Sequence, residues 1–179
     1  MTDLPAFETV YNDYKQLVYN LALHYSLNTE DAQDITQEVF VKVYQHFHKH
    51  DPSTASMKTW IYRITVNHCL DFLRSRNAKR RSGFLISLFS KKTNEPLNEM
   101  IHFDHPGIIA EDKEELSHLL FIINELPDSQ RTALILSKIE DRPQEEVAEI
   151  MNTTLKAIES LLQRAKQNLS KKLKESEGL

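Results

Sequence analysis

A polar face near the C-terminus has the side chains best suited to reading DNA. Between residues 155 and 174 apolar residues recur at helical spacing, and the positions between them are polar or basic. Ser and Gln can hydrogen-bond to base edges, and Lys and Arg can hold phosphates. Glu159 can accept from cytosine N4 or simply be solvated. The predicted recognition face comprises Lys156, Glu159, Ser160, Gln163, Arg164 and Lys166.

The segment before this face has the signals of a turn between two helices. Pro143 suits the first turn of a short amphipathic helix, because the missing N–H is no loss there. Asn152 tolerates the left-handed conformation that ends a helix, and Thr153 or Thr154 can cap the next one. Ala148 is small where the helices would meet. This spacing predicts a DNA-binding helix-turn-helix, although an ordinary helical hairpin would also fit.

A second polar stripe lies on a helix expected from about residue 56 to residue 76. An aromatic ring beside basic and amide side chains is typical of a surface that holds unpaired bases, by stacking, phosphate contacts and hydrogen bonds. The alternative is that Trp60 is a core residue. We name these residues the Trp60 stripe: Lys58, Trp60, Arg63, Asn67 and Arg74.

A third face is acidic and lies on a helix expected from about residue 30 to residue 48. Its apolar stripe is Ala32, Ile35, Val39, Val43 and Phe47, and the opposite side forms an acidic face of Asp31, Asp34, Gln37, Glu38 and Val41. Acidic side chains in the first turn of a helix interact favourably with the helix dipole. That effect explains Asp31 better than it explains Asp34 or Glu38, so the face is predicted to bind a basic partner.

Composition excludes several classes of protein. The chain has 179 residues, a net charge of −4 and only three glycines, which argues against a Gly-rich nucleotide-binding loop. Cys69 is the only cysteine, so no internal disulfide can form and a cytoplasmic location is expected. No apolar run has membrane-spanning length, so no direct membrane insertion is expected.

Basic residues cluster between Arg74 and Lys92 and near the C-terminus.

A metal-dependent enzyme is the remote alternative. His46, His48 and His50, with Asp51, alternate at the end of the second expected helix. No cysteine joins them, and a helix end does not easily bring such positions together. No catalytic residue, metal site or cofactor is therefore predicted.

Two long stretches, one in each half of the chain and the first made of two segments, resemble a known family. The segments DAQDITQEVFVKVYQHF, MKTWIYRITVNHCLDFLR and LPDSQRTALILSKIEDRPQEEVAEIMNTTLKAIESLLQRAKQNL closely resemble the extracytoplasmic-function sigma factors of bacterial RNA polymerase. The resemblance covers most of residues 5–80 and 111–173. It implies that the acidic face docks on core RNA polymerase, that the Trp60 stripe meets the −10 strand of promoter DNA, and that the recognition face lies in the −35 major groove.

The resemblance also implies an anti-sigma factor as a partner, and it has one departure. Where many members have Gly-Thr-Val-Lys-Ser-Arg, this chain has Lys156 to Leu161, with Glu159 replacing a basic residue. That replacement puts the −35 sequence in doubt. A two-domain helix-turn-helix transcriptional regulator remains the alternative function, but it would not explain the acidic face and the Trp60 stripe together.

The expected fold is all-α, with two small helical domains joined by a linker. Residues 1–81 form the N-terminal domain, residues 82–110 the linker, and residues 111–179 the C-terminal domain that contains the helix-turn-helix. Further helices are expected over residues 4–27 and 111–124. The apolar run Phe84 to Phe89 is unusual for a linker, and the sequence does not indicate its role.

Overall fold

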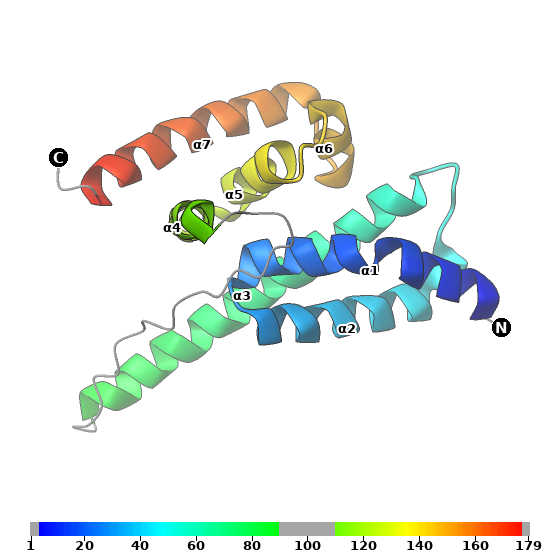
Figure 1. Cartoon of the computed structure of the whole chain (residues 1–179), viewed down its shortest axis with the longest axis horizontal. Helices are drawn as coiled ribbons and strands as arrows, with labels where there is room; N and C mark the ends of the chain where they lie inside the picture. Colours follow the sequence, from blue (N-terminus) through cyan, green and yellow to red (C-terminus); the bar gives the residue numbers. More distant parts are fainter. Residues whose placement is uncertain (1–3, 90–109, 177–179) are drawn as a thin grey trace.

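The computed structural model describes residues 4–89 and 110–176, and every regular element in these ranges is a helix. The N-terminal half (residues 4–89) contains α1 (Leu4–Ser26), α2 (Thr29–His46), the short 3₁₀ helix η1 (Phe47–Lys49) and α3 (Met57–Phe89). The C-terminal half (residues 110–176) contains α4 (Ala110–Asn124), α5 (Asp128–Leu134), the π-helical turn η2 (Ile135–Ile139), α6 (Gln144–Ile150) and α7 (Leu155–Ser176). The prediction of an all-α protein with two helical domains is confirmed (Figure 1).

The first three helices pack against one another around the apolar stripe expected on α2. Ala32, Ile35, Val39 and Val43 are buried, whereas Phe47 is only half-buried. Asn28 caps α2, because its side chain accepts a hydrogen bond of 2.9 Å from the backbone N–H of Asp31. Leu27, with a left-handed φ of 56°, turns the chain just before this cap, and α2 packs against α1.

The third helix is longer than expected. The sequence suggested an end near Arg76, but α3 continues to Phe89 and takes in the apolar run from Phe84. Gly83 alone does not stop a helix, and the Arg, Lys and Ala residues around it are good helix formers. Residues 90–109 of the expected linker lie outside the described residues, and its last residue, Ala110, begins α4.

The helix-turn-helix forms as the turn signals predicted. Asn152 has a φ of 49°, the left-handed conformation expected where α6 stops. Thr154 rather than Thr153 caps α7, since its hydroxyl accepts from the backbone N–H of Ala157 at 3.2 Å. Ala148 is 7% exposed and Ile158 is fully buried, so the small residue lies within the packed contact between the two helices.

The two halves share one hydrophobic core. A single cluster of buried residues extends from Val18 in α1 to Ala165 in α7. The hydroxyl of Tyr25, a buried residue of α1, donates to that of Thr132 in α5 at 2.9 Å. Figure 1 shows the C-terminal helices lying over α1 and α3. Within the described ranges, none of the helices combines the length and apolar character that crossing a membrane requires.

Candidate nucleic-acid interface

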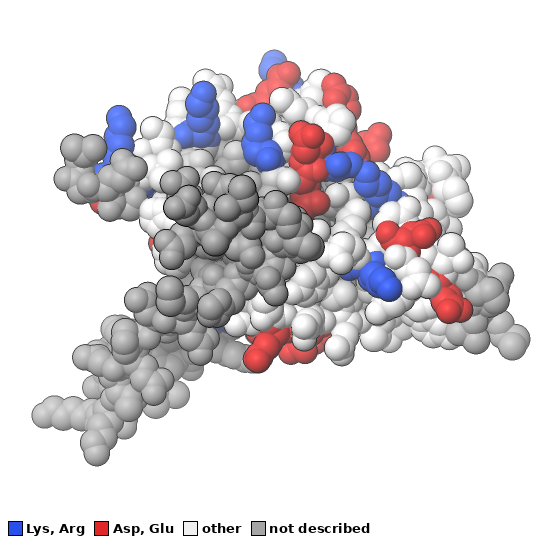
Figure 2. Space-filling view, viewed as in Figure 1, with Lys and Arg blue, Asp and Glu red and all other residues white. Residues whose placement is uncertain are grey.

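The recognition face is fully displayed on α7. Every one of its six residues is exposed, whereas Ile158 and Ala165 on the opposite side are buried. Arg164 is held along the helix, because its Nε donates to the carbonyl of Ser160 and its Nη2 to the Ser160 hydroxyl, each at 3.2 Å. In Figure 2, Lys and Arg side chains are spaced along α7. This helix can therefore present hydrogen-bonding groups and positive charge to a duplex without unpacking the core.

The Trp60 stripe lies along the first half of α3 and is less open than the recognition face. Asn67 is exposed, and Trp60 is half-buried with its ring 5.1 Å from that of His50. Trp60 also packs against the hydrophobic core. One part of the indole thus supports the fold while another part reaches solvent, so the binding of unpaired bases by Trp60 stays a prediction.

The cations of the Trp60 stripe bond to the C-terminal half. Lys58 Nζ lies 3.8 Å from a carboxylate oxygen of Glu146. Arg63 donates to the backbone carbonyl of Glu149 twice, from Nε at 3.1 Å and from Nη2 at 2.7 Å. A shallow groove of about 420 Å³ opens beside Arg63 and the turn of the helix-turn-helix. The sequence did not predict these pairings, because nothing local in the chain relates residues so far apart.

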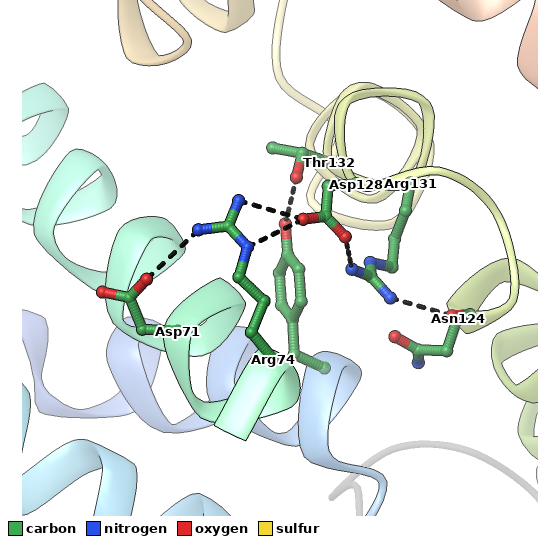
Figure 3. A network of polar contacts seen from close by, with 7 residues as sticks. Asp71, Arg74, Asn124, Asp128, Arg131 and Thr132 are labelled. Atoms are coloured by element: carbon green, nitrogen blue, oxygen red, sulfur yellow. Dashed lines mark hydrogen bonds and ion pairs between the residues drawn. The ribbon is translucent and has the colours of Figure 1, made fainter. Parts of the chain in front are cut away.

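Arg74, the last cation of the stripe, belongs to a network that crosses the halves (Figure 3). Its Nε and Nη2 donate to one carboxylate oxygen of Asp128 at 3.2 and 3.0 Å. The other oxygen of Asp128 accepts from Arg131, a buried residue whose guanidinium also donates to the carbonyl of Asn124 at 2.8 Å. Asp71 accepts from Arg74 at 3.2 Å on the solvent side.

The acidic face of α2 is displayed as expected, although two of its members are paired. Asp34, Gln37, Glu38 and Val41 are exposed, and Asp31 is half-buried with a carboxylate oxygen 3.5 Å from Arg76. Glu38 lies 3.0 Å from Nε2 of His68 on α3. The face thus combines carboxylates with one apolar side chain, Val41, that is 54% exposed.

His68 is held between opposite charges. Its Nδ1 lies 2.6 Å from Lys42 Nζ, and its Nε2 faces Glu38. Burial and the nearby Lys42 ammonium lower the pKa of His68, while Glu38 acts in the opposite direction. The neutral ring is favoured, which allows Nδ1 to accept from Lys42 while Nε2 donates to Glu38. This arrangement fixes Glu38 relative to α3.

A buried polar seam links the halves beside the Trp60 stripe. Glu140, which follows η2, lies with Oε1 3.0 Å from Nδ1 of the buried His24. Its Oε2 accepts from the hydroxyl of Tyr62 at 3.1 Å. Asn124 adds a hydrogen bond of 2.9 Å to the carbonyl of His24. No sequence motif marks these residues, because each is an ordinary polar position in its own helix.

The histidine-rich segment does not form a metal centre in the part of the chain that the structure describes. No group of three or more His, Cys, Asp or Glu side chains is placed there to hold an ion. The Nε2 of His50 lies 3.0 Å from the carbonyl of Ala55, and its ring packs on Trp60. The local role of His50 is therefore to support the turn before α3.

Comparison with known protein families defines the class of protein. Residues 10–79 match the model for Sigma-70 region 2, and residues 118–169 match the model for Sigma-70, region 4. The helices described above are those of a sigma factor. The chain belongs to the extracytoplasmic-function (ECF) RNA polymerase sigma factors, which act in transcription initiation and catalyse no covalent step.

Individual relatives are similar over most of the chain. RNA polymerase sigma factor SigV of Bacillus subtilis is 33% identical over 158 residues, which cover 88% of this chain and 84% of SigV. ECF RNA polymerase sigma factor SigE of Mycolicibacterium smegmatis is 28% identical over 93% of this chain, which spans 61% of that relative's length. The fold resembles Bartonella quintana RpoE, solved in complex with the anti-sigma factor NepR, with a TM-score of 0.69 and 20% identity over 96% of this chain and 98% of that one.

Proposed function

We propose that three surfaces divide the work of promoter recognition in this sigma factor. The acidic face docks on core RNA polymerase, the Trp60 stripe holds the unpaired −10 strand, and the recognition face enters the −35 major groove. The observation that carries this proposal is the clean division of α7, where Ser160 and Gln163 face solvent and Ile158 is fully buried. A helix anchored in this way can lie in a groove with its polar side chains against base edges.

In this proposal the Trp60 stripe offsets part of the free energy needed to open the DNA strands. Taking a base out of the stack costs a few kcal/mol, and stacking it on an aromatic ring returns about 1–3 kcal/mol. Asn67 is exposed about two helical turns after the half-buried Trp60, so its amide is available for a base-edge hydrogen bond. Asn67 therefore tests the surface better than Trp60, because replacing Trp60 also removes contacts to the core.

The same proposal implies a location and a further partner. The chain would work in the cytoplasm, where its polymerase and promoter are found. It would also bind an anti-sigma factor, which is supported by its structural resemblance to an RpoE solved in complex with the anti-sigma factor NepR.

Run-off transcription from genomic fragments with purified core enzyme tests the proposal as a whole. The wild-type protein should direct transcripts from a defined set of fragments. Asn67→Ala should slow promoter opening, followed by permanganate reactivity of unpaired thymines, without lowering the melting temperature. Asn12→Ala, an exposed position on α1, is the matched control. Specific DNA binding without any core-dependent transcription would favour a helix-turn-helix regulator instead.

A further inference from the structure

Glu38 and Lys42 both contact His68, although their spacing on α2 favours a direct ion pair. A Glu four residues before a Lys is the preferred order for such a pair along a helix. The imidazole of His68, from α3, contacts Lys42 Nζ at 2.6 Å through Nδ1 and a carboxylate oxygen of Glu38 at 3.0 Å through Nε2. Among the described residues, no ion pair joins Glu38 to Lys42 directly. The ring therefore acts as a spacer between the two charges.

The spacer is rigid and chemically matched to both neighbours. His68 is buried on α3, and α3 packs against α2, so the ring cannot swing away from its neighbours without disturbing the core. A neutral imidazole carries one acceptor and one donor on its two nitrogens, which suits an ammonium on one side and a carboxylate on the other. Hydrogen bonds linked in this way polarise and strengthen one another.

Glu38 is held by this contact and remains open to a partner. Its side chain is 68% exposed, and the exposed members Asp34, Gln37 and Val41 belong to the same acidic face. The attraction between two charges falls with their separation, so a carboxylate kept apart from Lys42 keeps more of its attraction for an outside cation. A direct pair with Lys42 would instead neutralise part of the face.

We propose that His68 is a positioning residue that keeps Glu38 apart from Lys42 and so leaves the Glu38 carboxylate available to a cation on core RNA polymerase. The inference rests on the function proposed above for the acidic face. It adds a buried residue of α3 that does not itself touch the polymerase. Removing the ring would let Glu38 and Lys42 form the ion pair that their spacing favours.

Carbodiimide coupling measures this separation within the full chain, without the polymerase. The reagent condenses a carboxylate and an amine in direct contact into an amide, and peptide mass spectrometry locates the link. Lys171 and Glu175, four residues apart on α7 with their charged groups at 3.9 Å, provide an internal reference. The Glu38–Lys42 amide should be scarce beside this reference in the wild-type protein and should reach a similar yield in His68→Ala. Equal yields in wild type and His68→Ala would overturn the spacer.

Competition with a labelled wild-type chain for core polymerase measures the consequence for docking. His68→Ala should bind core up to about 5-fold more weakly, the upper end for exposed ion pairs. His68→Gln should bind as wild type does, because its amide also offers one acceptor and one donor. Adding Lys42→Met to His68→Ala should restore binding, since no cation is left on α2 to pair with Glu38. Lys15→Met, the same charge change at an exposed position of α1, should not restore it.

A purely structural role for His68 predicts a different result. In that case Lys42→Met would leave the weakened binding of His68→Ala unchanged, which would overturn the inference. Melting curves establish that each variant is folded. If His68→Ala does not fold, His68→Leu fills the same buried site without a hydrogen-bonding group, and the same outcomes decide.

Glu38→Gln separates this inference from the proposed function of the acidic face. If Glu38→Gln binds core as tightly as wild type, Glu38 is not a docking residue, and both the docking role and the inference fall. If Glu38→Gln weakens binding while folded His68→Ala does not, the docking face stands and the positioning role of His68 is overturned.

Discussion

Glu159 is the residue whose replacement should change promoter choice. It is exposed on the recognition face, next to Ser160 and one turn before Gln163. Glu159 can accept from the N4 amino group of cytosine in the major groove. Glu159→Lys replaces this acceptor with a donor suited to guanine O6 and N7, and it leaves the buried side of α7 untouched.

The expected change is about 1–3 kcal/mol at one base pair, or about 5- to 150-fold in relative preference. The substitution also adds two units of positive charge, which strengthens binding to every promoter through the phosphates. Glu175→Lys separates the two effects. It makes the same charge change on the same helix, where Glu175 lies 3.9 Å from Lys171 and far along the chain from the recognition face.

Selection from a promoter library with a randomised −35 element measures the effect. Glu159→Lys should enrich a different base at one position, and Glu175→Lys should enrich the wild-type sequence. Identical preferred sequences for wild type and Glu159→Lys would show that Glu159 is a solvated bystander and reads no base.

Three further variants, one of them a double substitution, test the remaining surfaces and the charge around α2. Lys166→Ala should weaken all promoters alike and reduce the salt slope of binding by about one unit, measured by titration at several salt concentrations. Asp34→Arg with Glu38→Arg should weaken binding to core polymerase by about 2–5 kcal/mol if the lost pairs are buried, whereas Asp13→Arg on the exposed side of α1 should not. Because the pKa of His68 is lowered in the folded protein, the unfolded state binds more protons, so stability should fall as pH drops below about 6.5. His68→Gln should flatten that dependence in melting curves recorded at about pH 7 and about pH 5.

The sequence predicted the features that depend on residues close together in the chain, namely the buried stripe of α2, the end of α6 and the exposed recognition face. The apolar stripe of α2 is buried at Ala32, Ile35, Val39 and Val43 because helical periodicity alone selects one face. The stop at Asn152 follows from backbone sterics that act within a few residues. The exposed recognition face follows from both, since a helix with a fixed start and a fixed buried side has only one side left for solvent.

Features that depend on distant parts of the chain were not predicted. The charge of Arg63 is visible in the sequence, but its bond to the Glu149 carbonyl depends on how the two halves pack. The seam at Glu140 has the same origin. The end of α3 was also missed, because good helix formers without a clear apolar period resemble a linker.

The contact made by Arg63 should leave no covariation signal in an alignment of related sequences. Its acceptor is the main chain at position 149, which also accepts from the backbone N–H of Asn152 at 3.1 Å. Any residue type at 149 would offer the same carbonyl, so mutation there would not select for a compensating change at position 63. Covariation between aligned relatives would therefore miss this contact, whereas pairs of side chains such as Arg74 and Asp128 could be detected.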